Sequence, residues 1–391
     1  MKLACVVQRY GADIAGGSEA HCREVAERLA ARHEVTVLTT CARDYVTWAN
    51  ALPPGVSRER GVTVHRFPVV RPRDLKRFAD LSDEVFAGPT PVDRQEEWFR
   101  QNGPDCPGLL EHLGRSGGDY DLVLFWTYRY APSYFGSPLV ADRAVLVPTA
   151  EHDPAIDLTV LRDYFPRAAG YLFMTPEEEA LVGQRAGQPL QPSAVVGIGL
   201  EPAAPCPDAD RVRAEHGIPE PYVLYLGRVD RNKGCETLLD DFIAQADGLS
   251  ATLVLAGPST LVVPQHPRIR ALGYVSHVLR DALLAGARAL VVPSPYESLS
   301  IVLLEAWNRS VPALVNARCD VLAGQARRAN GGLYYRSPAE FGEALRFLLD
   351  DTAARDTLGR QGRAYVDREY RWPIVLDRIE ALLERARASG R

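Results

Sequence analysis

Short apolar runs alternate with amphipathic stretches along the chain, which is the pattern of repeated β-strand and α-helix units. Apolar runs that predict buried strands in the first half lie at residues 3–7, 34–39, 62–67, 121–125, 143–148 and 171–174. Those in the second half lie at residues 222–226, 252–256, 269–273, 289–292, 312–316 and 331–335. Helical patterns are clearest at residues 20–32, 235–246, 278–285, 301–308 and 372–387. This alternation predicts an α/β protein with doubly wound parallel sheets, because parallel strands need helical crossovers.

A passage rich in Pro, Ala and Asp at residues 201–210 interrupts the alternation and predicts a linker. With 391 residues, the chain is long enough for two domains that each bury a core. We therefore expect one α/β domain over residues 1–200 and a second over residues 201–372. The last helix, residues 373–391, has one apolar face, which we expect to pack on the protein itself.

Composition narrows the class of protein further. Hydrophobic residues make up 46% of the chain, the formal net charge is -5, and no apolar run is long enough to cross a membrane. The first residues lack the features of a signal peptide, and the seven cysteines show no CxxC spacing. We therefore expect a cytoplasmic protein with reduced thiols, without a metal site and without broad nucleic-acid binding.

The strongest candidate chemistry lies between residues 289 and 308. A short loop that holds Glu297 joins a predicted strand to a predicted helix, and Glu305 lies within that helix. The start of such a helix offers N–H groups without helical partners to an anion. Two acids beside an anion site are best explained by a ligand with hydroxyl groups on either side of a phosphate. That is the outline of a nucleotide sugar.

A second strand end carries two cations. The strand at residues 222–226 leads into the segment GRVDRNKG at residues 227–234. Arg228 and Lys233 would hold a diphosphate there, the arginine as a planar fork and the lysine as a point charge. The spacing is not that of a P-loop. Two solvated surface cations are the alternative, but the position at a strand end favours the clamp.

The first half of the chain offers two ligand-facing positions. Gly16 and Gly17 follow the first strand, where glycine allows close approach to the backbone; a plain turn with a helix capped by Ser18 is the alternative. His152 follows the strand at residues 143–148, where it would contact a sugar hydroxyl or transfer a proton. A cap for the following turn is the alternative for His152. Asp153 would orient the histidine ring or cap the next helix.

Two other segments have mainly structural interpretations. Residues 68–118 combine basic residues, aromatic residues and a Gly- and Pro-rich stretch. They would form an acceptor-binding or membrane-proximal segment, or an exposed helix and loop; we favour the second because charge runs are usually solvated surface. Thr175, Pro176 and Glu178 predict a capped helix start.

Together these features resemble the GT-B retaining glycosyltransferases, in particular glycosyltransferase family 4. The resemblance covers most of the chain, and its most specific parts are the cation clamp and the spacing of two glutamates. The family's E-x7-E signature matches Glu297 followed after seven residues by Glu305. The full set of matching positions is Gly16, Gly17, His152, Arg228, Lys233, Gly234, Glu297 and Glu305.

The resemblance implies two Rossmann-like domains that face each other across a cleft, with the last helix crossing back to the N-terminal domain. The C-terminal domain would bind the nucleotide of an activated sugar. Arg228 and Lys233 would hold the diphosphate, and Glu305 would accept hydrogen bonds from the ribose hydroxyls.

The resemblance also implies how the sugar is transferred. Glu297 would lie near the donor sugar and His152 near the reacting carbon, while the loop of Gly16 and Gly17 would contact phosphate or sugar. Cations and helix N–H groups would stabilise the leaving diphosphate. A donor phosphate oxygen would serve as base for the acceptor hydroxyl, so that transfer proceeds with retention and needs neither a separate base nor a metal.

The chain departs from the family at one point. Glycines often follow the first glutamate, as in E-G-x-G, whereas this chain has Ser298, Leu299 and Ser300. We keep these three residues in the expected nucleotide-sugar site, because serine hydroxyls donate hydrogen bonds and cap helices. The close approach that glycine gives is not expected to be fully kept there.

The expected activity is hexosyl transfer, in the enzyme class EC 2.4.1, from a nucleoside diphosphate sugar to an acceptor hydroxyl. The acceptor would be a glycan, a lipid-linked glycan or a small natural product. We expect a cytoplasmic bacterial enzyme without a transmembrane segment, and peripheral contact with the inner face of the membrane stays open.

Three rival functions differ in testable ways. A nucleotide-sugar 2-epimerase of similar fold would release free epimerised sugar without an acceptor. A silent nucleotide-sugar-binding subunit would not need the intact set of Arg228, Lys233, Glu297 and Glu305. A dehydrogenase would need GxGxxG followed by an acid about 20 residues on, which this chain lacks.

Overall fold

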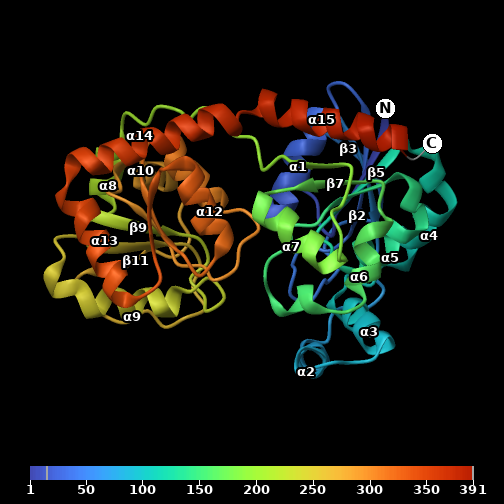
Figure 1. The fold of residues 1–391 in the computed structure, drawn as a ribbon, viewed down its shortest axis with the longest axis horizontal. Helices are drawn as coiled ribbons and strands as arrows, with labels where there is room; N and C mark the ends of the chain where they lie inside the picture. Colours follow the sequence, from blue (N-terminus) through green and yellow to red (C-terminus); the bar gives the residue numbers. More distant parts are fainter. Residues whose placement is uncertain (15, 390–391) are drawn as a thin grey trace. The chain divides into compact units, whose positions relative to one another are not determined.

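The protein forms two compact units in the computed structural model, which describes residues 1–14 and 16–389. The first unit is Met1–Gly197 together with Leu376–Arg391, and the second is Ile198–Val375. Each unit is built on one sheet that lies among helices (Figure 1). The predicted α/β architecture with two parallel sheets is therefore confirmed.

The sheet of the first unit has eight strands in the order β3-β4-β2-β1-β5-β6-β7-β8. Every neighbouring pair is parallel except β3 and β4, which are antiparallel. The strands are β1 (Lys2–Val6), β2 (Glu34–Thr40), β3 (Gly55–Glu59), β4 (Val62–Phe67), β5 (Leu122–Trp126), β6 (Ala144–Val147), β7 (Gly170–Phe173) and β8 (Ser193–Val195).

The sheet of the second unit has six parallel strands in the order β11-β10-β9-β12-β13-β14. The strand order reverses between β9 and β12, and ligands of such sheets bind at the carboxyl ends of the strands at this point. The strands are β9 (Tyr222–Leu226), β10 (Thr252–Ala256), β11 (Ile269–Ala271), β12 (Leu290–Val292), β13 (Ala313–Asn316) and β14 (Gly332–Tyr335).

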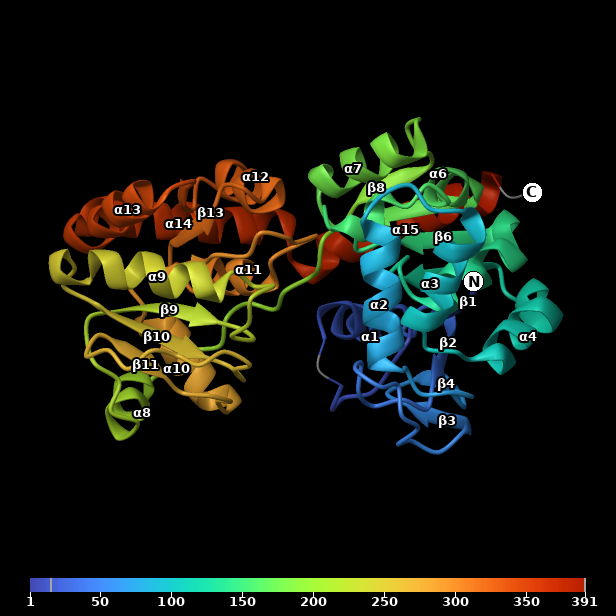
Figure 2. The same cartoon turned by 90° about the horizontal axis from the view of Figure 1, so that it is seen from below.

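Helices connect the strands in both units, and Figure 2 gives a second view of them. The first unit holds α1 (Gly17–Leu29), α2 (Leu75–Phe86), α3 (Val92–Asn102), α4 (Pro107–Ser116), α5 (Ala131–Gly136), α6 (Leu161–Tyr164) and α7 (Pro176–Ala186). The second unit holds α8 (Ala209–Glu215), α9 (Cys235–Gln245), α10 (His277–Gly286), α11 (Ile301–Asn308), α12 (Asp320–Ala329), α13 (Pro338–Asp350) and α14 (Thr352–Glu369). The last helix is α15 (Trp372–Ser389).

Twelve strands agree with the predicted apolar runs, whereas β3 and β8 were not predicted. All but the last residue of β3 are exposed, so the strand carries no apolar signal. β8 is only three residues long. Both are edge strands of the sheet, where pairing on one side is enough to order a short or polar segment.

The segment at residues 68–118 differs from the exposed helix and loop that we favoured. It forms α2, α3 and α4, and its Gly- and Pro-rich part contains α4. Trp98 and Phe99 on α3 are buried in the core of the first unit. Arg73 is also partly buried: its guanidinium lies 4.9 Å from the Trp48 ring centre, and burial lowers its pKa to about 10. The segment therefore contributes to the core as well as to the surface.

The predicted start of α7 is confirmed. The Thr175 hydroxyl accepts the Glu178 N–H at 3.2 Å, and Pro176 is the first helical residue. The alternative of a helix start capped by Ser18 does not hold, because α1 begins at Gly17 after Gly16 as N-cap, and the Ser18 hydroxyl donates to Glu19.

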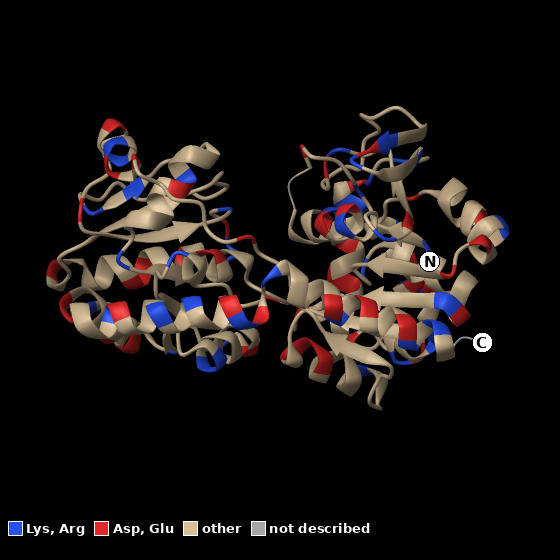
Figure 3. Cartoon of the chain, turned by 90° about the horizontal axis from the view of Figure 1, so that it is seen from above, with Lys and Arg blue, Asp and Glu red and all other residues tan. Residues whose placement is uncertain are grey.

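The apolar face of α15 packs on the protein, as predicted. Ile379, Leu382, Leu383 and Ala386 are fully buried. Acidic and basic residues are interspersed along α14 and α15 rather than gathered by sign (Figure 3). Within the described residues, no helix is both long and apolar enough to span a bilayer.

Gly257 gives a test of the packing that supports the second sheet. It has a φ of 144°, and a Cβ there would lie 1.9 Å from the Gly227 carbonyl oxygen. We expect Gly257→Ala to lower the free energy of unfolding by about 2 kcal/mol or more in urea denaturation. Gly114→Ala is the control, because its Cβ meets open space within α4 and should stabilise the protein by about 0.5–1 kcal/mol. Equal effects of the two changes would contradict the steric account.

Candidate functional site

Two loops of the second unit meet at the carboxyl ends of β9 and β12. Gly234, which ends the loop after β9, has a φ of 73°, and a Cβ there would lie 2.4 Å from the Pro293 carbonyl oxygen after β12. Asn316, at the end of β13, donates its side-chain N–H to the same Pro293 oxygen at 3.0 Å. Only glycine at position 234 combines this conformation with this contact.

Asp230 shapes the loop that carries the two predicted cations. Its buried carboxylate accepts the Lys233 backbone N–H at 2.8 Å and lies 3.5 Å from Arg228 Nη2. Sequence reasoning missed Asp230, although its position between two cations in a Gly-bounded loop is the signal of a side chain that bonds its own turn. Asp230 therefore orients both residues of the clamp.

The predicted phosphate cation and the predicted sugar carboxylate form a salt bridge with each other. Lys233 Nζ lies 2.9 Å from Glu297 Oε1, with 29% of the lysine and 13% of the glutamate side chain exposed. Cys319, at the start of α12, lies beside Glu297, and burial raises the pKa of its thiol to about 11. The structure thus brings Lys233 and Glu297 together, which no pattern in the sequence indicated.

Glu305 is held by a cation as well. Its carboxylate forms an ion pair with Arg280 of α10, and both side chains are partly buried. Burial raises the pKa of Glu305, while the neighbouring Arg280 opposes that rise. Arg280 was not predicted, because a basic residue on a helix gives no indication of its partner on another helix. Each glutamate of the E-x7-E pair therefore faces its own cation.

The loop of Ser298, Leu299 and Ser300 leads into α11, whose predicted bounds are confirmed. Ser298 is partly exposed, while Leu299 and Ser300 are buried. Ser300 is the N-cap residue, but its side chain makes no cap hydrogen bond in the described structure. Its backbone N–H is instead donated to Gln325 Oε1 of α12 at 3.2 Å. The expected hydroxyl cap at this position is therefore wrong.

In the first unit, Gly16 makes room for a buried ion pair. Arg9 Nε lies 2.8 Å from Glu19 Oε1, and each side chain is only 6% exposed. A Cβ on Gly16 would lie 2.2 Å from Glu19 Oε2 and 3.1 Å from Arg9 Nη2. Gly16 is thus required by packing, whatever it binds, and Gly17 begins α1.

His152 lies in the loop after β6, and its side chain is exposed. The next residue, Asp153, caps the short helix that follows by accepting the Ala155 N–H at 3.2 Å, and it pairs with Arg129 at 2.7 Å. Of the two roles considered for Asp153, the structure thus shows the cap. On the other side of His152, the Ala150 N–H is donated to the buried Glu178 carboxyl at 2.6 Å. The loop is fixed at both ends.

Backbone strain marks the same edge of this sheet. Thr127 follows β5 with a φ of 63°, and Thr149 follows β6 with a φ of 48°. Their hydroxyls lie 3.0 Å apart. β-Branched residues rarely adopt positive φ, and strained residues of this kind gather at ligand-binding edges. His152 therefore lies three residues after one of these strained positions.

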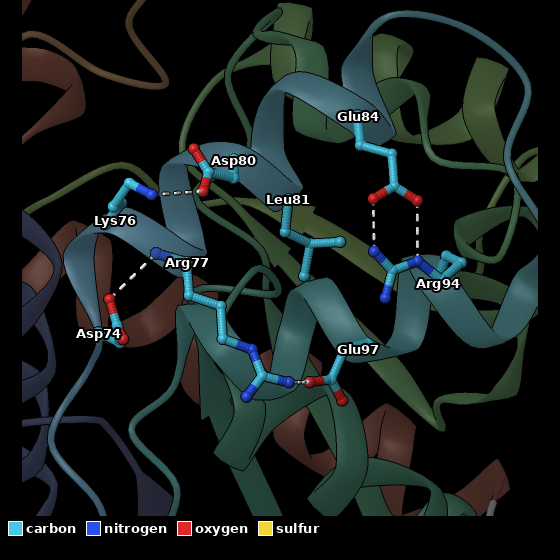
Figure 4. A pocket seen from close by; sticks show the side chains of 8 residues that line it. All are labelled: Asp74, Lys76, Arg77, Asp80, Leu81, Glu84, Arg94 and Glu97. Atoms are coloured by element: carbon cyan, nitrogen blue, oxygen red, sulfur yellow. Dashed lines mark hydrogen bonds and ion pairs between the residues drawn. The ribbon is translucent and has the colours of Figure 1, made fainter.

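One hollow in the first unit lies away from these residues. It has a volume of ≈ 310 Å³ between α2 and α3 (Figure 4). Ion pairs line it: Arg77 lies 3.0 Å from Glu97, Arg94 Nε lies 2.8 Å from Glu84, and Lys76 lies 3.8 Å from Asp80. Exposed pairs of this kind contribute only about 0.2–1 kcal/mol each. The pairs Arg77–Glu97 and Arg94–Glu84 join the two helices, whereas Lys76 and Asp80 both lie on α2.

Among residues 1–14 and 16–389, no group of three or more His, Cys, Asp or Glu side chains is placed to hold a metal ion. The candidate site is therefore described by its cations, carboxylates and helix starts. In the second unit, the residues of the candidate site are Arg228, Lys233, Arg280, Glu297, Ser298, Leu299, Ser300 and Glu305.

Comparison with known proteins agrees with this description. Residues 220–351 match the family description "Glycosyl transferases group 1". An uncharacterised glycosyltransferase of Methanocaldococcus jannaschii is 23% identical over 96% of each chain. Sucrose-phosphate synthase from Thermosynechococcus elongatus matches in structure with a TM-score of 0.73, at 20% identity over 100% of both chains. HepE of Anabaena, solved in complex with UDP, matches with a TM-score of 0.73, at 15% identity over 98% of this chain and 100% of that one.

These matches bear on the fold and on the class of protein. The fold is the GT-B fold that the sequence predicted. The family match over the second unit and the full-length relative support a GT-B glycosyltransferase.

The ion pair between Arg280 and Glu305 gives a pH-dependent test. Arg280→Met removes the cation that favours ionised Glu305, so the Glu305 pKa in the folded protein should rise further above its unfolded value of about 4.3. Below that value both states carry the proton, and no penalty arises. As the pH rises towards neutrality, the variant should lose about 1–3 kcal/mol of unfolding free energy relative to the original chain.

Urea denaturation at pH 4 and pH 7.5 measures this difference. The double variant Arg280→Met, Glu305→Gln is the control, because it has no carboxylate left to ionise. A deficit of equal size at both pH values in Arg280→Met would show that lost packing, not charge, is responsible.

Proposed function

We propose that the protein is a retaining glycosyltransferase that moves a hexosyl-type group from a nucleoside diphosphate sugar to an acceptor hydroxyl. The observation that supports this most directly is the ion-paired E-x7-E constellation: Glu297 faces Lys233, and Glu305 faces Arg280. Lys233 and Glu297 come from the loops after β9 and β12, where the strand order of the second sheet reverses, which is the ligand-binding point of such sheets.

Lys233 would exchange one anion for another when the donor binds. In the ligand-free protein its ammonium group is neutralised by Glu297 at 2.9 Å. A diphosphate carries more charge than one carboxylate, so the ammonium group would turn to the phosphate together with Arg228. Glu297 would then be released to accept hydrogen bonds from the donor sugar. Charge neutralisation and sugar recognition are coupled in this way.

Glu305 would keep its cation throughout. Arg280 fixes the carboxylate on α11 and leaves it oxygen lone pairs for other donors. The hydroxyls of a ribose are suitable donors, because a carboxylate accepts two neighbouring hydroxyl hydrogens. This role uses the ribose, which all nucleotides share, and so sets no base preference.

The leaving diphosphate would be stabilised by fixed positive groups. Arg228, Lys233 and the N-terminus of α11 would supply them, and we expect no metal ion to be required. A phosphate oxygen of the donor would take the proton of the acceptor hydroxyl, so that transfer occurs on one face of the sugar. His152 would contact the sugar near the reacting carbon, and Gly16 and Gly17 would contact phosphate or sugar.

A thermal-shift screen with UDP, GDP, ADP, TDP and CDP and their sugars tests the proposal. A ligand that binds only the folded state raises the melting temperature. UDP is the first to examine, because the structural neighbour HepE was solved with it. No shift with any of these compounds would overturn the proposed function, and release of free epimerised sugar from a bound donor would favour the epimerase.

Lys233→Met tests the phosphate clamp. The change removes the ammonium group and keeps most of the aliphatic chain, so the affinity for the selected nucleoside diphosphate should fall about 10- to 100-fold. The affinity for the corresponding nucleoside should stay within twofold. Isothermal titration calorimetry measures both. Lys76→Met is the matched control, since Lys76 is exposed on α2 and pairs only weakly with Asp80; unchanged diphosphate affinity in Lys233→Met would remove Lys233 from the site.

His152→Ala tests the other unit. If His152 acts near the reacting carbon, turnover should fall about 100-fold while nucleotide affinity stays within twofold. Release of nucleoside diphosphate from the donor sugar measures turnover. His266→Ala, in a loop of the second unit where the ring accepts the Arg268 N–H, serves as control. Wild-type turnover in His152→Ala would leave His152 with a structural role.

A further inference from the structure

Two buried side chains at the start of α11 carry hydrogen-bonding atoms without partners. Ser300 is 3% exposed and Gln325 is fully buried. Neither Ser300 Oγ nor Gln325 Nε2 has a hydrogen-bond partner among the residues that the structure describes. The other end of the same amide is used, because Gln325 Oε1 accepts the Ser300 N–H at 3.2 Å.

Such atoms are exceptional, since nearly all buried polar groups in folded proteins are paired. The Gln325 amide nitrogen is a donor, and the Ser300 hydroxyl can donate too. A ligand rich in acceptor oxygens would satisfy both at once. The first N–H groups of α11 have no partners within the helix and favour the same kind of ligand.

The surroundings identify the acceptor as an anion rather than a neutral group. Ser300 follows Glu297 by three residues, and Glu297 holds Lys233 at 2.9 Å. The loop with Arg228 and Lys233 packs against Pro293 at the start of this same segment. Cations and hydrogen-bond donors therefore converge on the short stretch between β12 and α11.

We propose that Ser300 and Gln325 act together as a side-chain clamp for the donor diphosphate. The Ser300 hydroxyl reaches a phosphate oxygen by rotation about one bond and donates a hydrogen bond to it. Gln325 holds the Ser300 N–H through its Oε1 atom and donates its unpartnered amide N–H to the same phosphate group. This inference rests on the proposed function, because it assigns two further contacts to the same nucleotide-sugar site.

Ser300→Ala distinguishes a role in ligand binding from a role in folding, because the two roles predict different changes in melting temperature and in ligand affinity. Removing a buried hydroxyl without a partner should leave the melting temperature of the ligand-free protein unchanged or raised. The affinity for the nucleoside diphosphate selected from UDP, GDP, ADP, TDP and CDP should nevertheless fall about tenfold or more. The affinity for its nucleoside should stay within twofold. A merely structural Ser300 would lower the melting temperature and leave the ratio of the two affinities unchanged, which would overturn the proposal.

Gln325→Glu tests the second member at nearly constant shape. The carboxylate still accepts the Ser300 N–H, but it replaces an amide donor by an anionic oxygen near the phosphate. Diphosphate affinity should fall more than tenfold, with nucleoside affinity within twofold. Gln361→Glu is the matched control: it makes the same charge change on α14, where Gln361 Oε1 accepts the Asn330 side-chain N–H.

The outcomes separate the two proposals. If no nucleoside diphosphate binds the unaltered chain, the proposed function and this clamp both fail. If the unaltered chain binds and Lys233→Met weakens binding, while Ser300→Ala and Gln325→Glu bind like Gln361→Glu, only the clamp of Ser300 and Gln325 is overturned.

Discussion

The salt bridge between Lys233 and Glu297 depends on one constraint, which is that parallel strands end at the same edge of a sheet. β9 and β12 are neighbours although some 60 residues separate them, so the loops that follow them must meet. Gly234 sets how closely they meet by packing against the Pro293 carbonyl oxygen. Asp230 then aims Lys233 and Arg228, and the chain from Pro293 to Ser300 carries Glu297 to them. Sheet topology thus brings the two loops of the candidate site together, and the individual residues set the contacts within it.

The fold could be predicted from the sequence wherever local pattern and tertiary environment agree. The buried strand β12 and the helix α11 give clear apolar and helical signals, and their positions were predicted correctly. Strand β3 gave no signal because its side chains are mostly exposed, and the burial of Trp98 was hidden in a charged segment. Candidate site residues were predicted because strand ends, glycines and charges are local features. Their partners Arg280 and Gln325 were not, because helix packing decides which side chains from α10 and α12 reach α11.

In the first unit, buried groups fix the loop that carries the exposed His152. Glu178, which the sequence indicated only as part of a helix cap, accepts the N–H groups of Ala150 and Met174 from inside the core. Burial raises the pKa of this carboxyl to about 8. Arg129 and Asp153 fix the other end of the loop. His152 is therefore exposed on a rigid support, which suits a residue that must meet a ligand in one orientation.

The pairing of three cations of the candidate site, Arg228, Lys233 and Arg280, also bears on how fast a donor arrives. Arg228 lies near Asp230, Lys233 faces Glu297, and Arg280 faces Glu305, so cations and carboxylates balance in the ligand-free site. A balanced cluster has a weak field beyond its immediate surface, and the net charge of the chain is -5. An approaching diphosphate is therefore not drawn in over long distances, and its encounter rate should depend little on ionic strength. The attraction develops only after contact, so that salt acts mainly on the lifetime of the complex.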